Sequence, residues 1–245
     1  MNTAEARALG QRIATLVQSG EPRKAQAKLA PVFAERTPFR LLDRIGAAIG
    51  AGPLELVNGF VEAVAAGRTE GGWVVIASAL RQQLERDAPG AFVRCRALII
   101  AADIWYATDI LGERVPGPAL LSQFEPALAL LTPWREDGNR WIRRTVGVAA
   151  HFWAKRTHGR TEYAREAEML LGFLEPMFEE RDMDAVKGVG WGLKTLGRYY
   201  PALTADWLRL QVVERRRPHR TLLLRKALTY LRAAERDHAT GDAGR

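Results

Sequence analysis

The sequence predicts an all-α fold on three observations. Apolar residues recur at intervals of three and four along most of the chain, the spacing of one helix face. The alternating Val, Ile and Thr patterns of strands are nearly absent. Short segments rich in Gly, Pro and Asp separate the periodic stretches. Many helices with short connections suggest antiparallel pairs stacked as an α-solenoid.

The helices are expected in twelve segments of similar length. They are 3–19, 22–34, 38–50, 53–66, 70–86, 90–112, 117–132, 139–157, 161–179, 183–200, 202–214 and 219–236. Their lengths imply about six helix pairs with a period of about 40 residues, typical of HEAT-like repeats. We expect a single domain over 1–237 and a disordered tail over 238–245.

Length and composition narrow the class of protein. A chain of 245 residues buries a core large enough to fold without disulfides or metal. Its single cysteine, Cys95, and the absence of Cys/His clusters point to a reducing compartment, with no metal and no cofactor. The amino terminus lacks the apolar run of a signal peptide, and no window is apolar enough to span a membrane. We therefore expect a cytoplasmic monomer without membrane contact.

The positive charge is concentrated in one part of the chain. The formal net charge is +8, and residues 140–232 hold 19 Lys and Arg against 10 Asp and Glu. This segment therefore carries the whole excess, which would attract a polyanion. A basic surface that serves only solubility is the alternative.

Segment 183–200 divides into an apolar and a basic face on a helical wheel. Val186, Val189, Leu193, Leu196 and Tyr200 form the core stripe, whereas Lys187, Trp191, Lys194 and Arg198 lie nearly opposite. Gly188, Gly190 and Gly192 surround the tryptophan although each lowers helix propensity by roughly 1 kcal/mol. This favours close approach of a large ligand to the basic face. The alternative is that Trp191 packs against the next helix.

Segment 139–157 shows the same division. Its second stripe consists of Arg140, Arg144, Gly147, His151 and Lys155, and it contains no acidic residue to form pairs along the helix. Arginine presents a planar fork of donors that suits phosphate oxygens. We interpret the stripe as a phosphate-binding face; His151 alone is more typical of a surface histidine.

The apolar segment 90–112 contains one unusual carboxylate. Trp105 and Asp109 are separated by four residues and share a helix face. A carboxylate in such a helix must be paired or exposed in a cleft. A salt bridge to Arg144 is one explanation, and a carboxylate presented in an aromatic cleft is the other.

A carboxylate near aromatic rings and arginines suits cleavage of an N-glycosidic bond. The reaction develops oxocarbenium character on the sugar, which an anion and aromatic faces stabilise. Asp109 could also orient water toward the anomeric carbon. A purine made cationic by alkylation at N3 or N7 leaves without a general acid, so no second carboxylate is required.

Three segments resemble the signature regions of the DNA alkylation repair (AlkD-like) glycosylase family. They are Trp105-x-x-x-Asp109, Trp141-Ile142-Arg143-Arg144 and Lys187-Gly188-Val189-Gly190-Trp191-Gly192-Leu193-Lys194. A later basic loop, Arg215-Arg216-Arg217-Pro218-His219-Arg220, and the helix segment Leu224-Arg225-Lys226-Ala227-Leu228 are also similar. The resemblance covers about residues 90–232, whereas residues 1–89 fit only as generic helical repeats.

The resemblance implies a right-handed HEAT-like solenoid whose concave basic groove binds duplex DNA containing alkylated bases. It implies base excision without flipping the base into a pocket, and association with the bacterial nucleoid. Asp109 would be the catalytic carboxylate, Trp105 and Trp191 would contact the deoxyribose, and Arg144 would hold the backbone. Further DNA contacts are expected from Arg140, Arg143, His151, Lys155, Lys187, Lys194, Arg198, Arg216, Arg220 and Arg225.

Two departures from the family pattern bear on substrate range. Tyr106 stands where many members have a second Trp or another residue, and Lys194 replaces a common Arg. Two other functions share some of these features. A non-catalytic DNA-binding solenoid would differ only at Asp109, and a protein-interaction scaffold would bind an acidic partner in its groove.

Overall fold

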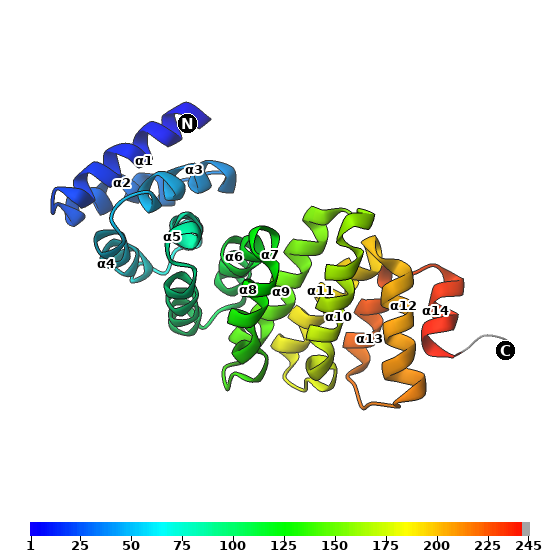
Figure 1. The fold of residues 1–245 in the computed structure, drawn as a ribbon. Helices are drawn as coiled ribbons and strands as arrows, with labels where there is room; N and C mark the ends of the chain where they lie inside the picture. Colours follow the sequence, from blue (N-terminus) through cyan, green and yellow to red (C-terminus); the bar gives the residue numbers. More distant parts are fainter. Residues whose placement is uncertain (242–245) are drawn as a thin grey trace. The chain divides into compact units, whose positions relative to one another are not determined.

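The computed structural model describes residues 1–241, and this part of the chain is helical with no β-strand. The all-α class predicted from the sequence is confirmed. Its helices pack into two units, Met1–Val115 and a second that begins at Pro116, and each is described by itself (Figure 1). None of the helices within 1–241 is both long and apolar enough to cross a bilayer. The solenoid, its hand, its helix pairing and the single domain over 1–237 remain predictions.

The N-terminal unit contains six helices. They are α1 (Thr3–Gln18), α2 (Pro22–Ala34), α3 (Phe39–Gly50), α4 (Leu54–Ala65), α5 (Glu70–Ala102) and α6 (Trp105–Arg114). Asn2 caps α1 through a capping box with Glu5, and Thr69 caps α5, so both helices begin at residues whose side chains satisfy free amide groups. Helix α3 packs against α1 and α5 and forms the centre of the unit.

Two irregular residues divide the long helical region of this unit. Asp87 leaves helical geometry (φ −157°, ψ 68°), so α5 bends where the sequence predicts a turn. Asp103 adopts the left-handed conformation (φ 44°) and ends α5, and Ile104 is extended before α6 begins. The continuous helix predicted over 90–112 is therefore wrong. Aspartate tolerates left-handed geometry better than most residues, which lets it end a helix without glycine.

The C-terminal unit is built around two long helices, α9 (Arg140–Thr157) and α11 (Met183–Tyr199). Asn139 caps α9 and Asp182 caps α11. The two helices pack along each other, and α11 also contacts α13 (Thr221–Ala227) (Figure 1). The other α-helices are α7 (Pro116–Ser122), α8 (Phe124–Leu131), α10 (Ala164–Leu174), α12 (Pro201–Arg209) and α14 (Ala233–Thr240).

Several predicted helices of this unit are shorter than the apolar spacing suggested. Segment 117–132 breaks at Gln123, and 161–179 splits into α10 flanked by the 3-10 turns η2 (Thr161–Tyr163) and η3 (Glu175–Glu179). A π-turn, η4 (Leu210–Glu214), continues α12, and the 3-10 turn η1 (Thr132–Glu136) follows α8. Another 3-10 turn, η5 (Leu228–Tyr230), separates α13 from α14.

The disordered tail predicted from residue 238 begins too early, because the last helix extends to Thr240. The residues His238, Ala239 and Thr240 belong to α14, and Ala239 is buried. Gly241 ends the helix with a positive φ of 76°. The rest of the predicted tail, residues 242–245, lies outside the described residues.

Candidate functional site

Five cations from three helices gather on the C-terminal unit. The pKa of Lys226 on α13 is lowered, first by burial and then by repulsion from Lys194, Arg144, Arg225 and Lys187. These four residues come from α9, α11 and α13, and the sequence predicted all four as DNA-binding. We call the five residues the basic cluster. Because its members repel one another, an anion placed among them would be held by several charges at once.

Arg144 is the most buried member of the basic cluster, with 7% of its surface exposed. Its side chain lies over Gly188, where a Cβ atom would come within 2.7 Å of the arginine Cγ. Its Nη1 donates to the backbone oxygen of Asp184 at 3.2 Å. The guanidinium is thereby fixed in direction, although the sequence had placed it on an open helix face.

The glycines beside Trp191 hold two helices together. A Cβ on Gly147 of α9 would collide with the backbone of Gly188 on α11, and one on Gly192 would lie 2.7 Å from the oxygen of Gly147. The expectation that the glycines around Trp191 admit a ligand is therefore wrong at Gly188 and Gly192, because the neighbouring helix fills the space. Gly190 instead faces α13, where its Cβ would lie 2.7 Å from Lys226 Cδ.

Trp191 is partly exposed, and one face of its indole lies against His151. The two rings stack with centroids 3.9 Å apart and planes inclined by 24°. Trp191 thus packs on the neighbouring helix, as the alternative interpretation held, and its side chain still reaches the surface; the approach of a ligand stays a prediction. One indole face is fixed in orientation by this contact.

His151 is buried beneath this tryptophan, with 7% of its surface exposed. Its Nδ1 lies 2.7 Å from the Thr195 hydroxyl, which itself donates to the backbone oxygen of Trp191. Burial lowers the pKa of His151 to about 4, with further lowering by Lys155 and Lys194. The imidazole is therefore neutral at pH 7. The sequence had placed His151 at the surface, and that exposure is wrong; its DNA contact stays a prediction.

Tyr230 adds a second aromatic side chain beside the basic residues. It is 45% exposed, and its ring lies under Lys194 Nζ at 5.0 Å and the Arg198 guanidinium at 5.1 Å. Tyr230 was not among the predicted site residues, because it lies in the turn η5, which interrupts the helix predicted over 219–236. Its only signal was its position shortly after the segment containing Arg225 and Lys226.

Arg143 is engaged within the protein. Its guanidinium forms an ion pair with Glu180 at 2.6 Å and donates to the backbone oxygen of Asp137 at 2.6 Å. Both side chains of the pair are mostly buried. The geometry thus favours a structural role for Arg143 over the predicted DNA contact.

Two other predicted contacts meet an acidic neighbour. Arg140 lies 3.5 Å from Asp184 and Lys187 lies 3.2 Å from the same carboxylate. The stripe of α9 contains no acidic residue of its own, and Asp184 belongs to α11. Both cations remain exposed, as does Lys155 near the end of α9.

The loop after η4 displays arginines to solvent. Arg215 and Arg217 pair with Glu175, and Arg217 also pairs with Glu179 at 2.7 Å. Between them Arg216 is exposed and has a left-handed φ of 49°. Its neighbours anchor the loop, so the backbone turns Arg216 outward. Arg220 is also exposed at the start of α13.

Trp105 and Asp109 lie on α6, in the N-terminal unit. Trp105 is 56% exposed and packs edge to face against Tyr106, with ring centroids 5.8 Å apart. Asp109 is partly buried one turn later on the same helix. The break at Asp103 therefore places the tryptophan in the first turn of a short helix, instead of inside a long apolar one.

No group of three His, Cys, Asp or Glu residues within 1–241 could hold a metal ion. Residues 64–231 match the family model of the DNA alkylation repair enzymes. Neither a search of curated proteins nor one of solved structures found a match.

Proposed function

This chain belongs to the DNA alkylation repair enzyme family, and we propose that it is a DNA glycosylase that excises cationic N3- and N7-alkylated purines from duplex DNA. The observation that carries the proposal is the basic cluster beside Trp191, within the matched region. Cations from three helices suit the phosphates of a nucleic acid strand, and the fixed indole suits a deoxyribose.

The proposed reaction is hydrolysis of the bond between C1′ of the sugar and the purine nitrogen. Both electrons of this bond pass to the nitrogen, so the cationic purine leaves as a neutral base. The sugar becomes an oxocarbenium ion, which the negative charge of Asp109 stabilises. Water attacks C1′, its proton is released through Asp109, and an abasic site remains.

Aromatic residues and the leaving group complete the mechanism. Trp105 within the N-terminal unit, and Trp191 within the C-terminal unit, each present an aromatic face, which favours a developing positive charge on a deoxyribose. Because a cationic purine needs no proton donor, no side chain has to contact the edge of the base. We propose on this ground that the base is not flipped into a pocket.

Excision of a single 7-methylguanine from an oligonucleotide duplex tests the proposal. We expect abasic sites in single-turnover reactions and a fall in rate on the order of 100-fold for Asp109→Asn, with DNA affinity kept. Glu113→Gln is the matched control, because it neutralises another carboxylate of α6. If Asp109→Asn excises as fast as an active parent, Asp109 is not the catalytic carboxylate. If the parent releases no cationic purine, the glycosylase proposal is wrong and the protein is a non-catalytic DNA-binding protein.

Arg144→Ala tests the contribution of the basic cluster to DNA binding, whereas Asp109→Asn tests the chemical step. This change removes a fixed guanidinium from the basic cluster, so affinity and excision should fall together. The salt dependence of binding should become shallower as well, because fewer counterions are released. Unchanged affinity would contradict a phosphate contact at Arg144.

A further inference from the structure

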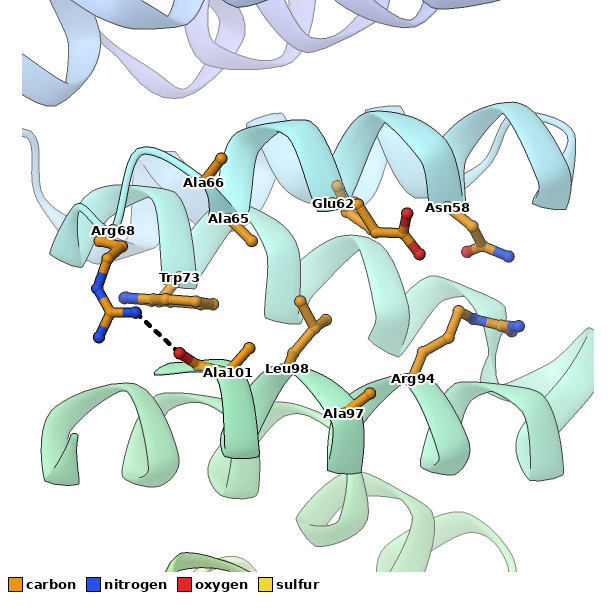
Figure 2. A pocket seen from close by; sticks show the side chains of 11 residues that line it. Asn58, Glu62, Ala65, Ala66, Arg68, Trp73, Arg94, Ala97, Leu98 and Ala101 are labelled. Carbon is orange, nitrogen blue, oxygen red and sulfur yellow. Dashed lines mark hydrogen bonds between the residues drawn. The ribbon is translucent and has the colours of Figure 1, made fainter. Parts of the chain in front are cut away.

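A pocket of about 480 Å³ lies inside the N-terminal unit, between α4 and α5. Figure 2 shows its two long walls, one from α4 and one from the second part of α5, with mostly small or apolar side chains between them. Ala65, Ala97 and Leu98 line the middle of the pocket. This volume is within the range of pockets that hold small molecules.

Trp73 closes one end of the pocket and carries a hydrogen-bond donor without an acceptor. The side chain is 2% exposed, and its Nε1–H has no partner among the described residues. Figure 2 shows the indole nitrogen on the side of the ring nearest the Arg68 guanidinium. A buried indole N–H is usually hydrogen-bonded, so this end of the pocket lacks an acceptor.

Arg68 supplies a fixed cation at the same end. Its guanidinium donates to the backbone oxygens of Ala101 at 2.8 Å and Ala102 at 2.6 Å, the last carbonyls of α5. Because a guanidinium has more N–H groups than these two bonds use, it can still donate to a ligand. A positive charge and an unused N–H donor thus meet at one end of an apolar pocket.

The other end of the pocket has different chemistry. Figure 2 shows Glu62, Asn58 and Arg94 there. Arg94 is paired with Asp87 at 2.9 Å, and Asn58 accepts a hydrogen bond from Gln83. The Glu62 carboxylate would repel an anion at this end, so an anionic group is favoured only beside Trp73 and Arg68.

We propose that this pocket binds a small organic carboxylate with an apolar aryl or alkyl body. The carboxylate oxygens accept hydrogen bonds from Trp73 Nε1 and the Arg68 guanidinium, and the apolar body lies across Ala65, Ala97 and Leu98. The fit rests on the unpartnered donor, the fixed cation and the small lining side chains. The site lies within one unit and requires no DNA, so the proposal is independent of the glycosylase assignment.

The test uses 4-phenylbutyrate as probe and the indole N–H signals of the protein labelled with ¹⁵N-tryptophan. Trp73→Phe assigns the Trp73 signal by its disappearance. We expect 4-phenylbutyrate to shift this signal downfield, because a charge-assisted hydrogen bond forms at that proton. The uncharged analogue 4-phenyl-1-butanol should bind at least about tenfold more weakly.

A pair of alanine substitutions locates the site. Ala97→Leu fills the pocket from an exposed helix position and should weaken 4-phenylbutyrate binding at least about tenfold. Ala63→Leu makes the same change on α4 outside the pocket and should leave affinity unaltered. Absence of binding, equal affinity for the alcohol, or equal effects of the two leucine variants would each overturn the proposal.

Discussion

Gly147→Ala should destabilise the protein although alanine is the better helix former. A Cβ at this position would lie below 3.0 Å from backbone atoms of Gly188, whereas ordinary contacts begin at 3.4 Å. Backbone atoms cannot rotate away, so α9 and α11 must separate by about 1 Å. The overpacking costs about 1–3 kcal/mol, against a gain of about 1 kcal/mol from helix propensity.

The matched control is Gly172→Ala in α10 of the same unit. This glycine is exposed, and nothing lies within 4 Å of the Cβ that alanine would add. The same chemical change should therefore stabilise the protein by up to about 1 kcal/mol. Urea denaturation of both variants measures the two free energies of unfolding, which should change in opposite directions.

Excision of 7-methylguanine by the same two proteins tests the link from packing to activity. Separating α9 from α11 shifts Arg144 and the stack of His151 on Trp191, and a misplacement of about 1 Å can lower a rate on the order of 100-fold. Gly172→Ala should keep the parent rate. If Gly147→Ala proves as stable and as active as Gly172→Ala, the close helix contact does not position these residues.

Three further predictions follow from charges in the C-terminal unit. Duplex DNA affinity should fall steeply with salt, at a log–log slope near −0.9 per phosphate contacted, and a flat response would contradict binding through the basic cluster. The pKa of His151 is about 4 in the folded protein, against 6.5 for an ordinary histidine. Its contribution to the free energy of unfolding is therefore complete above pH 6.5 and is lost as the pH falls toward 4. The loss amounts to about 3 kcal/mol, which His151→Gln should remove from the pH dependence of unfolding. Arg143→Ala should cost about 2–3 kcal/mol of stability, because it leaves the partly buried Glu180 without its cation. The dependence of DNA affinity on salt should keep the same slope. A shallower slope would instead indicate that Arg143 contacts a phosphate.

The sequence predicted helices well where caps and turns agree with the apolar spacing. Expected segments 22–34 and 139–157 match α2 and α9 within a residue. It failed at Asp103, where the apolar pattern continues through the break and no glycine or proline marks the end of the helix. The left-handed backbone conformation of Asp103 cannot be predicted from the spacing of apolar residues.

The candidate site shows what a single helical wheel can and cannot predict. The wheel of residues 183–200 correctly grouped Lys187, Trp191 and Lys194. The wheel of residues 139–157 could not show that Asp184 pairs with Arg140, because that carboxylate comes from another helix. Partners on other helices depend on packing, so a stripe that looks purely basic can be partly neutralised.

The basic stripes of α9 and α11 form one surface because glycines allow the two helices to meet. The contact of Gly147 with Gly188 brings Arg144 against α11 and places His151 under Trp191. Lys226 of α13 lies against Gly190 of α11, and its pKa is lowered by burial and by the surrounding like charges, which disfavours the folded state while the lysine is charged. Repulsion of this kind weakens folding unless an anion is bound.

DNA should therefore stabilise this unit against unfolding, and replacing Lys226 by Met should raise stability without DNA while weakening DNA binding. Thermal denaturation with and without a DNA duplex measures both effects, and a Lys226→Met variant that is less stable alone would contradict this account.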